Sequence, residues 1–200
     1  MQNLVRESIE NTRKVIDLVL ADNELQASVV RAGEACVAAL QQRNKILLCG
    51  NGGSAADSQH IAAELVSRLN YDRPGLSAVA LTTDTSALTA IGNDYGFERA
   101  FSRQVEALGQ KGDVLIAIST SGNSPNILKA LEAAKLQGLK TIGMTGKTGG
   151  KMAALCDIVL KMPSTHTPNI QECHIMLGHI ICQIIEDTIF GEEYGSKHIA

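Results

Sequence analysis

Five short aliphatic runs recur along the chain, and helix-length segments separate them. The runs are KILLC (45–49), SAVAL (77–81), DVLIAI (113–118), LKTIGM (139–144) and DIVLK (157–161). Continuous apolar strands that alternate with helices are typical of a parallel sheet whose two faces are both covered. The sequence therefore predicts an α/β fold in which a five-stranded parallel sheet is the middle layer of an αβα sandwich.

Apolar residues recur at intervals of three and four on both sides of this region. Residues 4–43 contain no proline, and their spacing predicts two helices that break near Asp22, forming an N-terminal helical hairpin over residues 1–43. A final helix is expected to begin at Thr167 and to end before Gly191. We expect one domain over residues 1–200, with the core at 44–190 and a frayed polar tail at 191–200.

Composition and charge exclude several classes of partner. The chain is 44% hydrophobic and only 3% aromatic, and its net charge of -3 leaves no basic stripe for nucleic acid. The sequence contains no obvious membrane span or secretory signal, so we expect a cytoplasmic protein without nucleic-acid or membrane partners. The odd number of cysteines, without a Cys-x-x-Cys pair, predicts buried free thiols.

Two strand-to-helix junctions are alike, KILLCGNGGSAAD and DVLIAISTSGNSPN. A loop of small residues that enters a helix presents backbone N–H groups and the positive end of the helix dipole. In the second junction four hydroxyl side chains could surround a phosphate monoester: Ser119, Thr120, Ser121 and Ser124. The alternative is an ordinary turn with serine caps.

The first junction also matches the G-x-G-x-x-A pattern of dinucleotide-binding proteins. In those proteins an acidic residue about 20 positions later holds the ribose. Here Asp84 follows Gly50 by 34 residues, which is too far, so the sequence disfavours a dinucleotide site.

Two polar pairs stand out in the helical segments. His60 and Glu64 lie one turn apart on the helix after the glycine turn, where they could hold a metal or act as acid and base, or simply form a solvated pair. His179 lies among apolar residues and could equally be a hydrogen-bonded core histidine. Gln171 lies eight residues before His179, about 12 Å along a straight helix and about 80° around it. These two residues could share one ion only with a bent helix, extended side chains or two chains.

The motifs together resemble the phosphoheptose isomerases of the sugar isomerase (SIS) domain superfamily, which have a flavodoxin- or Rossmann-like fold. The matching segments are CGNGGSAADSQHIAAE, LTTDTSALTAIGNDYGFERAFSRQVEALG, GDVLIAISTSGNS, TGKTGGKMA and IQECHIMLGHIICQIIE. The resemblance spans the chain. It implies an aldose-ketose isomerase that converts sedoheptulose 7-phosphate to D-glycero-D-manno-heptose 7-phosphate, the first step towards ADP-heptose for lipopolysaccharide.

The resemblance also implies a set of site residues. Zinc, one ion per subunit, is expected on His60, Glu64, Gln171 and His179. Glu64 and His179 are the expected acid/base residues. Besides Glu64 and Gln171, the implied substrate contacts are Asn51, Gly52, Gly53, Asn93, Asp94, Ser119, Thr120, Ser121 and Ser124. The family further implies a homotetramer with sites at subunit boundaries. The chain departs from many relatives at Pro168-Asn169, where they carry a charged residue.

A non-catalytic protein that binds the replication initiator DnaA is the alternative within the same superfamily. That relative lacks the glutamate and the last-helix histidine that correspond to Glu64 and His179. Because both are present here, the sequence favours the enzyme.

Overall fold

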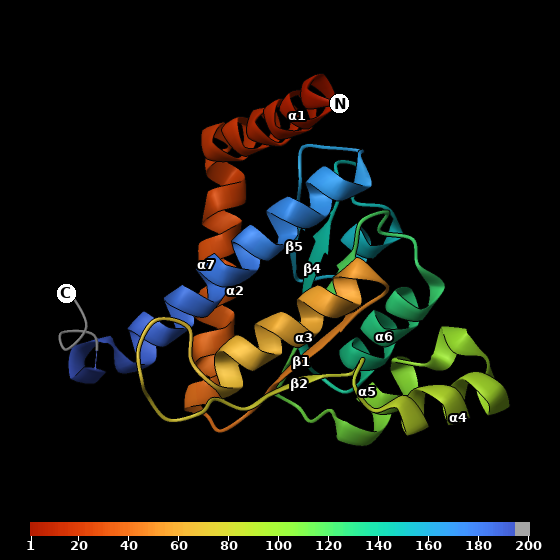
Figure 1. The fold of residues 1–200 in the computed structure, drawn as a ribbon. Helices are drawn as coiled ribbons and strands as arrows, with labels where there is room; N and C mark the ends of the chain where they lie inside the picture. The colour runs from red at the N-terminus through yellow and green to blue at the C-terminus, as the bar shows by residue number, and fades with distance from the viewer. Residues whose placement is uncertain (195–200) are drawn as a thin grey trace.

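A five-stranded parallel sheet forms the centre of the computed structural model, which describes residues 1–194 (Figure 1). The strand order is β2-β1-β3-β4-β5. The strands are β1 (Ile46–Gly50), β2 (Ala78–Ala80), β3 (Val114–Ser119), β4 (Lys140–Thr145) and β5 (Ile158–Lys161). The predicted sheet is confirmed, and each strand lies within one residue of its expected bounds.

Helices cover both faces of the sheet because successive strand residues point in opposite directions. Ile46 and Leu48 face one core, and Leu47 and Cys49 face the other. The first core is covered by α2 (Asn23–Gln41), α3 (Gly53–Val66) and α7 (Thr167–Tyr194). The second is covered by α5 (Ser102–Leu108) and α6 (Pro125–Leu136), with α4 (Thr85–Tyr95) and the 3₁₀ helices η1 (Phe97–Arg99) and η2 (Lys151–Ala154) beside them.

The two N-terminal helices meet at a corner. α1 (Gln2–Ala21) and α2 are separated by Asp22, whose side chain accepts a hydrogen bond from the Leu25 N–H at 2.9 Å. The predicted helices and their break are confirmed, but Figure 1 shows α1 turning away from α2 rather than lying beside it as in a tight hairpin. One non-helical residue is too short a connection to reverse the chain. α1 is instead attached to α7, where Thr12 donates to Glu172 at 2.7 Å.

The last helix is longer than expected. α7 continues through Gly191 to Tyr194, so the predicted end before Gly191 is wrong. One glycine costs a helix only about 1 kcal/mol, which packing along a long apolar face offsets. The predicted frayed tail lies outside the described residues from position 195 onward. By length and hydropathy α7 resembles a membrane span, but it packs on α2 and α3, and core helices commonly pass the same test.

Candidate active site

Three polar side chains converge where α3 lies against α7. The Nε2 atoms of His60 and His179 are 2.8 Å apart, and Glu64 Oε1 lies 3.3 Å from His60 Nε2. One ligand atom from each of the three residues lies within 4.8 Å of the others. The His60 side chain is 48% exposed and that of Glu64 is 19% exposed, so the cluster is reachable from solvent yet partly enclosed.

Glycine allows α3 and α7 to approach this closely. A Cβ atom at Gly178, next to His179, would lie 2.7 Å from Ile61 Cδ1 on α3. Such a distance is far below van der Waals contact, so a larger residue would require the buried Ile61 side chain or the helices to shift. The glycine beside His179 therefore contributes to the short spacing between the two imidazoles.

Gln171 lies at the other end of the same helix pair. Its side-chain amide packs on Gly53, where an added Cβ atom would be 2.5 Å from Gln171 Nε2. Gly53 precedes His60 by seven residues, or about 10 Å along α3. Within one chain, the structure therefore brings together His60, Glu64 and His179 and leaves Gln171 about two turns away.

The donor atoms of the cluster fit a zinc ion. Imidazole nitrogens and carboxylate oxygens are common zinc ligands, and two histidines with one glutamate form a set that leaves a coordination position open. The donors come from two rigid helices and are already close together.

Asp57 is a neighbouring carboxylate that the sequence reasoning missed. It lies on α3 one turn before His60, and its Oδ2 is buried without a hydrogen-bond partner among the described residues. Burial raises the pKa of Asp57, and the nearby His60 opposes that rise. The D-x-x-H spacing on one helix face was the signal that could have revealed it.

The serine-rich junction lies where β3 meets α6. Ser119 is buried at the end of β3, and its Oγ is 3.0 Å from Oγ of Ser124, which precedes the first residue of α6. Thr120 is half-buried and Ser121 is exposed. Gly122 turns the loop in the left-handed region (φ 65°) and packs so closely on Gly149 that a Cβ would lie 2.2 Å from its carbonyl oxygen.

The glycine turn after β1 is joined to this loop. The Asn51 and Asn126 side chains exchange two hydrogen bonds of 2.9 and 2.8 Å. The Asn51 amide, expected to contact substrate, thus connects the turn to α6. Gly52 (φ 56°) precedes α3, and no described atom lies within 4 Å of a Cβ built there, so its backbone faces open space.

Asn93 and Asp94 lie apart from the other candidates. Both are exposed on α4, where Asn93 Nδ2 donates to Asp94 Oδ1 at 2.8 Å. Every residue of α4 is exposed or half-buried, and Figure 1 shows this helix at the edge of the molecule, away from α7. A single chain does not bring these two residues to the histidine cluster.

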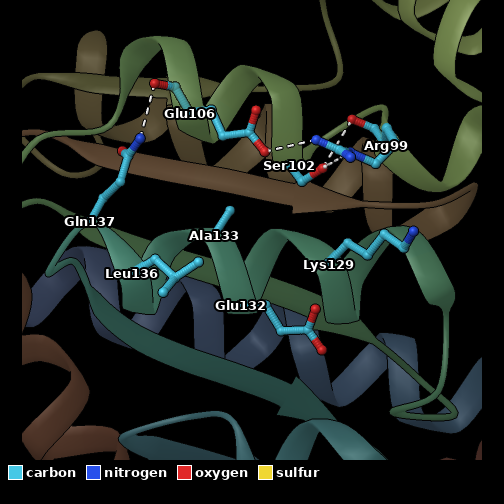
Figure 2. A pocket seen from close by; sticks show the side chains of 8 residues that line it. All are labelled: Arg99, Ser102, Glu106, Lys129, Glu132, Ala133, Leu136 and Gln137. Atoms are coloured by element: carbon cyan, nitrogen blue, oxygen red, sulfur yellow. Dashed lines mark hydrogen bonds and ion pairs between the residues drawn. The ribbon is translucent and has the colours of Figure 1, made fainter.

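A surface groove lies elsewhere. It encloses about 480 Å³ between α5 and α6, and Figure 2 shows the side chains that line it. Three of its four charged side chains form ion pairs. Arg99 donates to Glu106 at 3.0 Å, and Lys129 pairs with Glu98. None of the residues that line it belongs to the predicted site.

Comparisons with known proteins agree on one family. The SIS domain family model matches residues 9–146. The phosphoheptose isomerase of Burkholderia pseudomallei is 58% identical over 94% of this chain and 96% of its own length, and that of Aneurinibacillus thermoaerophilus is 55% identical over 98% and 99%.

Structural comparison gives the same result. The solved phosphoheptose isomerase of Neisseria gonorrhoeae matches with a TM-score of 0.88 at 46% identity, covering 93% of this chain and 98% of that one. These relatives give no support to the replication-initiator alternative. The chain therefore belongs to the SIS domain family and, within it, to the phosphoheptose isomerases.

Proposed function

We propose that this isomerase converts sedoheptulose 7-phosphate to D-glycero-D-manno-heptose 7-phosphate at the cluster of His60, Glu64 and His179. The observation that carries the proposal is the convergence of two imidazoles and a carboxylate from α3 and α7. Phosphoheptose isomerases that are more than 50% identical to this chain support the substrate class. The product would feed ADP-heptose synthesis for lipopolysaccharide.

An aldose-ketose isomerase moves one proton between two neighbouring carbons and another between their oxygens. Glu64 is suited to take the proton from the carbon next to the carbonyl and return it to the former carbonyl carbon. His179 is suited to give and receive the proton on oxygen. The atoms balance within the substrate, so the reaction requires no external oxidant or reductant.

His60, Glu64 and His179 would hold a zinc ion. Gln171 is the fourth ligand that the family implies, but within one chain it lies about two turns away, packed on Gly53. The zinc ion, when bound, would act as a Lewis acid that polarises the substrate carbonyl. His60 remains the residue without a proposed proton-transfer role, so its function is to hold the metal.

The phosphate would bind at the junction of β3 and α6. Ser119, Ser121 and Ser124 offer hydroxyl donors there, and the N-terminus of α6 adds the positive end of its dipole. The turn at Asn51 is hydrogen-bonded to the same helix, which supports a contribution of the exposed Gly52 backbone to phosphate binding.

We further propose a homotetramer whose active sites lie at subunit boundaries. An apolar groove of about 350 Å³ lies between α1, α2 and α7, and several apolar side chains of α1 are exposed: Leu4, Val5, Ile9 and Ile16. The separation of Asn93 and Asp94 from the histidine cluster supports construction from more than one chain. The five free cysteines suit a reducing compartment such as the cytoplasm.

Incubation of the purified protein with sedoheptulose 7-phosphate, followed by detection of the aldose, tests the proposal. A chelator should abolish turnover, and added zinc should restore it. His60→Ala and His179→Ala should each lose bound zinc by elemental analysis, whereas His166→Ala, at an exposed histidine before α7, should keep it. Absence of the aldose product would refute the substrate assignment. Full activity in protein free of transition metals would refute the role of zinc.

A further inference from the structure

Arg73 is a buried arginine in the loop between α3 and β2, and its guanidinium covers the end of α3. It donates to the backbone carbonyl of Glu64 at 2.8 Å, of Leu65 at 2.7 Å and of Ser67 at 3.1 Å. The last four carbonyls of a helix have no partner within the helix, and a cation near them also complements the dipole. Arg73 thus stabilises the turn of α3 that carries Glu64.

Glu186 on α7 is the partner of this arginine. Its carboxylate is fully buried and accepts from Arg73 Nε at 3.0 Å. The backbone N–H groups of Leu69 and Asn70 donate to the same carboxylate at 3.0 and 2.8 Å. One ion pair therefore joins the end of α3, the following loop and α7.

The pair lies close in sequence to the proposed active site on both helices. Glu186 follows His179 by seven residues, or about two turns of α7, and the arginine holds the carbonyl of Glu64 itself. We propose that Arg73 and Glu186 are positioning residues, which hold α3 and α7 in the register that brings Glu64 and His60 to His179. This inference rests on the proposed function of those three residues.

Without the guanidinium, the Glu64 carbonyl would lose this partner and the Leu65 carbonyl would keep only the Leu76 N–H, so the last turn of α3 would loosen. Glu64 would then lose its fixed place relative to the reacting carbon, and small misplacements of a catalytic group can cost about 100-fold in rate. The proposed phosphate site on α6 would be unaffected. We therefore expect kcat to fall about 10- to 100-fold while KM stays within about twofold.

The test compares two double variants. Removing one partner of a buried pair leaves an uncompensated charge, whereas replacing both with apolar residues is often tolerated. Arg73→Met with Glu186→Leu is therefore the principal variant. The matched control is Lys45→Met with Asp113→Leu, which removes another largely buried pair, 2.6 Å apart, from the starts of β1 and β3. Arg73→Lys adds a variant that keeps the buried charge paired but loses the guanidinium fork.

We expect kcat, but not KM, to fall in the principal double variant and, by a smaller factor, in Arg73→Lys. The Lys45→Met, Asp113→Leu control should keep a kcat close to that of the wild type. Hydrogen exchange at the amides of residues 62–66 should be faster in the principal variant than in the control. A folded principal variant with wild-type kcat would overturn the proposal, and so would unchanged exchange at these amides. If the wild-type protein lacked isomerase activity, the proposed function would fail, while the exchange experiment would still decide whether the pair holds α3.

Discussion

Among the described residues, a fully buried ion pair occurs in only one of the two helical layers of the molecule. In the layer of α2, α3 and α7, the Arg73–Glu186 pair has side chains no more than 1% exposed, and His174 is fully buried. In the layer of α4, α5 and α6, the ion pairs lie at the surface. Arg99 and Glu106 are 37% and 39% exposed, and their pairing contributes little stability.

The same two layers differ in their candidate site residues. One set is brought together within a single chain, and the other would reach the active site only from a second chain. His60, Glu64 and His179 belong to the first layer, and the packing of α3 on α7 sets their spacing. Asn93 and Asp94 belong to the second layer and lie on an exposed helix. We therefore expect substitutions in the first layer to act within one chain and those on α4 to act across chains.

The largest expected effect is that of Glu64→Gln, which replaces a carboxylate with an amide of the same shape. Loss of the proposed base should reduce kcat by roughly 10²- to 10⁴-fold and leave the fold intact. Steady-state kinetics and circular dichroism would measure the two quantities. Glu132→Gln, at an exposed position of α6, is the control. Near-full turnover of Glu64→Gln would remove Glu64 from the mechanism.

Mixed refolding tests the contrast between the layers directly. Glu64→Gln and His179→Ala fall in the same cluster of one chain, so their mixture should stay inactive. A mixture of Glu64→Gln with Asp94→Ala should regain roughly a quarter of wild-type activity if each site takes its cluster from one chain and α4 from another. Recovery of activity in the mixture of Glu64→Gln with His179→Ala would contradict the expectation that one chain supplies the whole cluster. No recovery in the mixture of Glu64→Gln with Asp94→Ala would contradict the expectation that α4 acts across chains. A monomeric mass by light scattering would refute the tetramer.

The buried His174 should make the first layer sensitive to acid. Burial lowers the pKa of His174 to about 4 from its ordinary 6.5, and its Nε2 lies 3.2 Å from the Thr145 carbonyl oxygen. The unfolded chain therefore binds a proton below pH 6.5 that the folded chain takes up only near pH 4. The contribution of the neutral His174 to the free energy of unfolding is therefore complete above pH 6.5. It should fall by about 3 kcal/mol as the pH drops to 4.

Denaturant titrations between pH 4 and 7 would measure that loss. His174→Gln cannot take up the proton, so its free energy of unfolding should fall less over the same range. His166→Gln, at an exposed histidine, should follow the wild type. Equal slopes for His174→Gln and wild type would show that His174 does not carry the acid sensitivity.

The smallest expected effect belongs to the loop at the start of α6. Ser121→Ala and Ser124→Ala should each raise KM for the phosphorylated substrate by roughly 2- to 13-fold, or about 0.5–1.5 kcal/mol, because each removes one hydrogen-bond donor. Ser8→Ala on the exposed α1 is the control. An unchanged KM in both variants would move the phosphate site elsewhere.

Much of the fold follows from local sequence patterns. The five aliphatic runs predicted the strands within one residue, because buried parallel strands are apolar on both faces. The end of α7 could not be predicted from Gly191, since a glycine permits a helix end but does not require one. The angle between α1 and α2 at Asp22 was also not predicted. Periodicity indicates where one helix ends and the next begins but not the angle between their axes.

For the site, the sequence alone indicated the residues that we propose to carry chemistry. The four-residue spacing of His60 and Glu64 places both on one helix face, whatever the rest of the chain does. The tertiary structure alone decided that His179 joins them while Gln171 packs on Gly53, and that Arg73 contacts the Glu64 carbonyl. The reason is physical. Spacing along one helix follows from its fixed pitch, whereas contact between two helices depends on side-chain volumes and glycines at positions far apart in the chain.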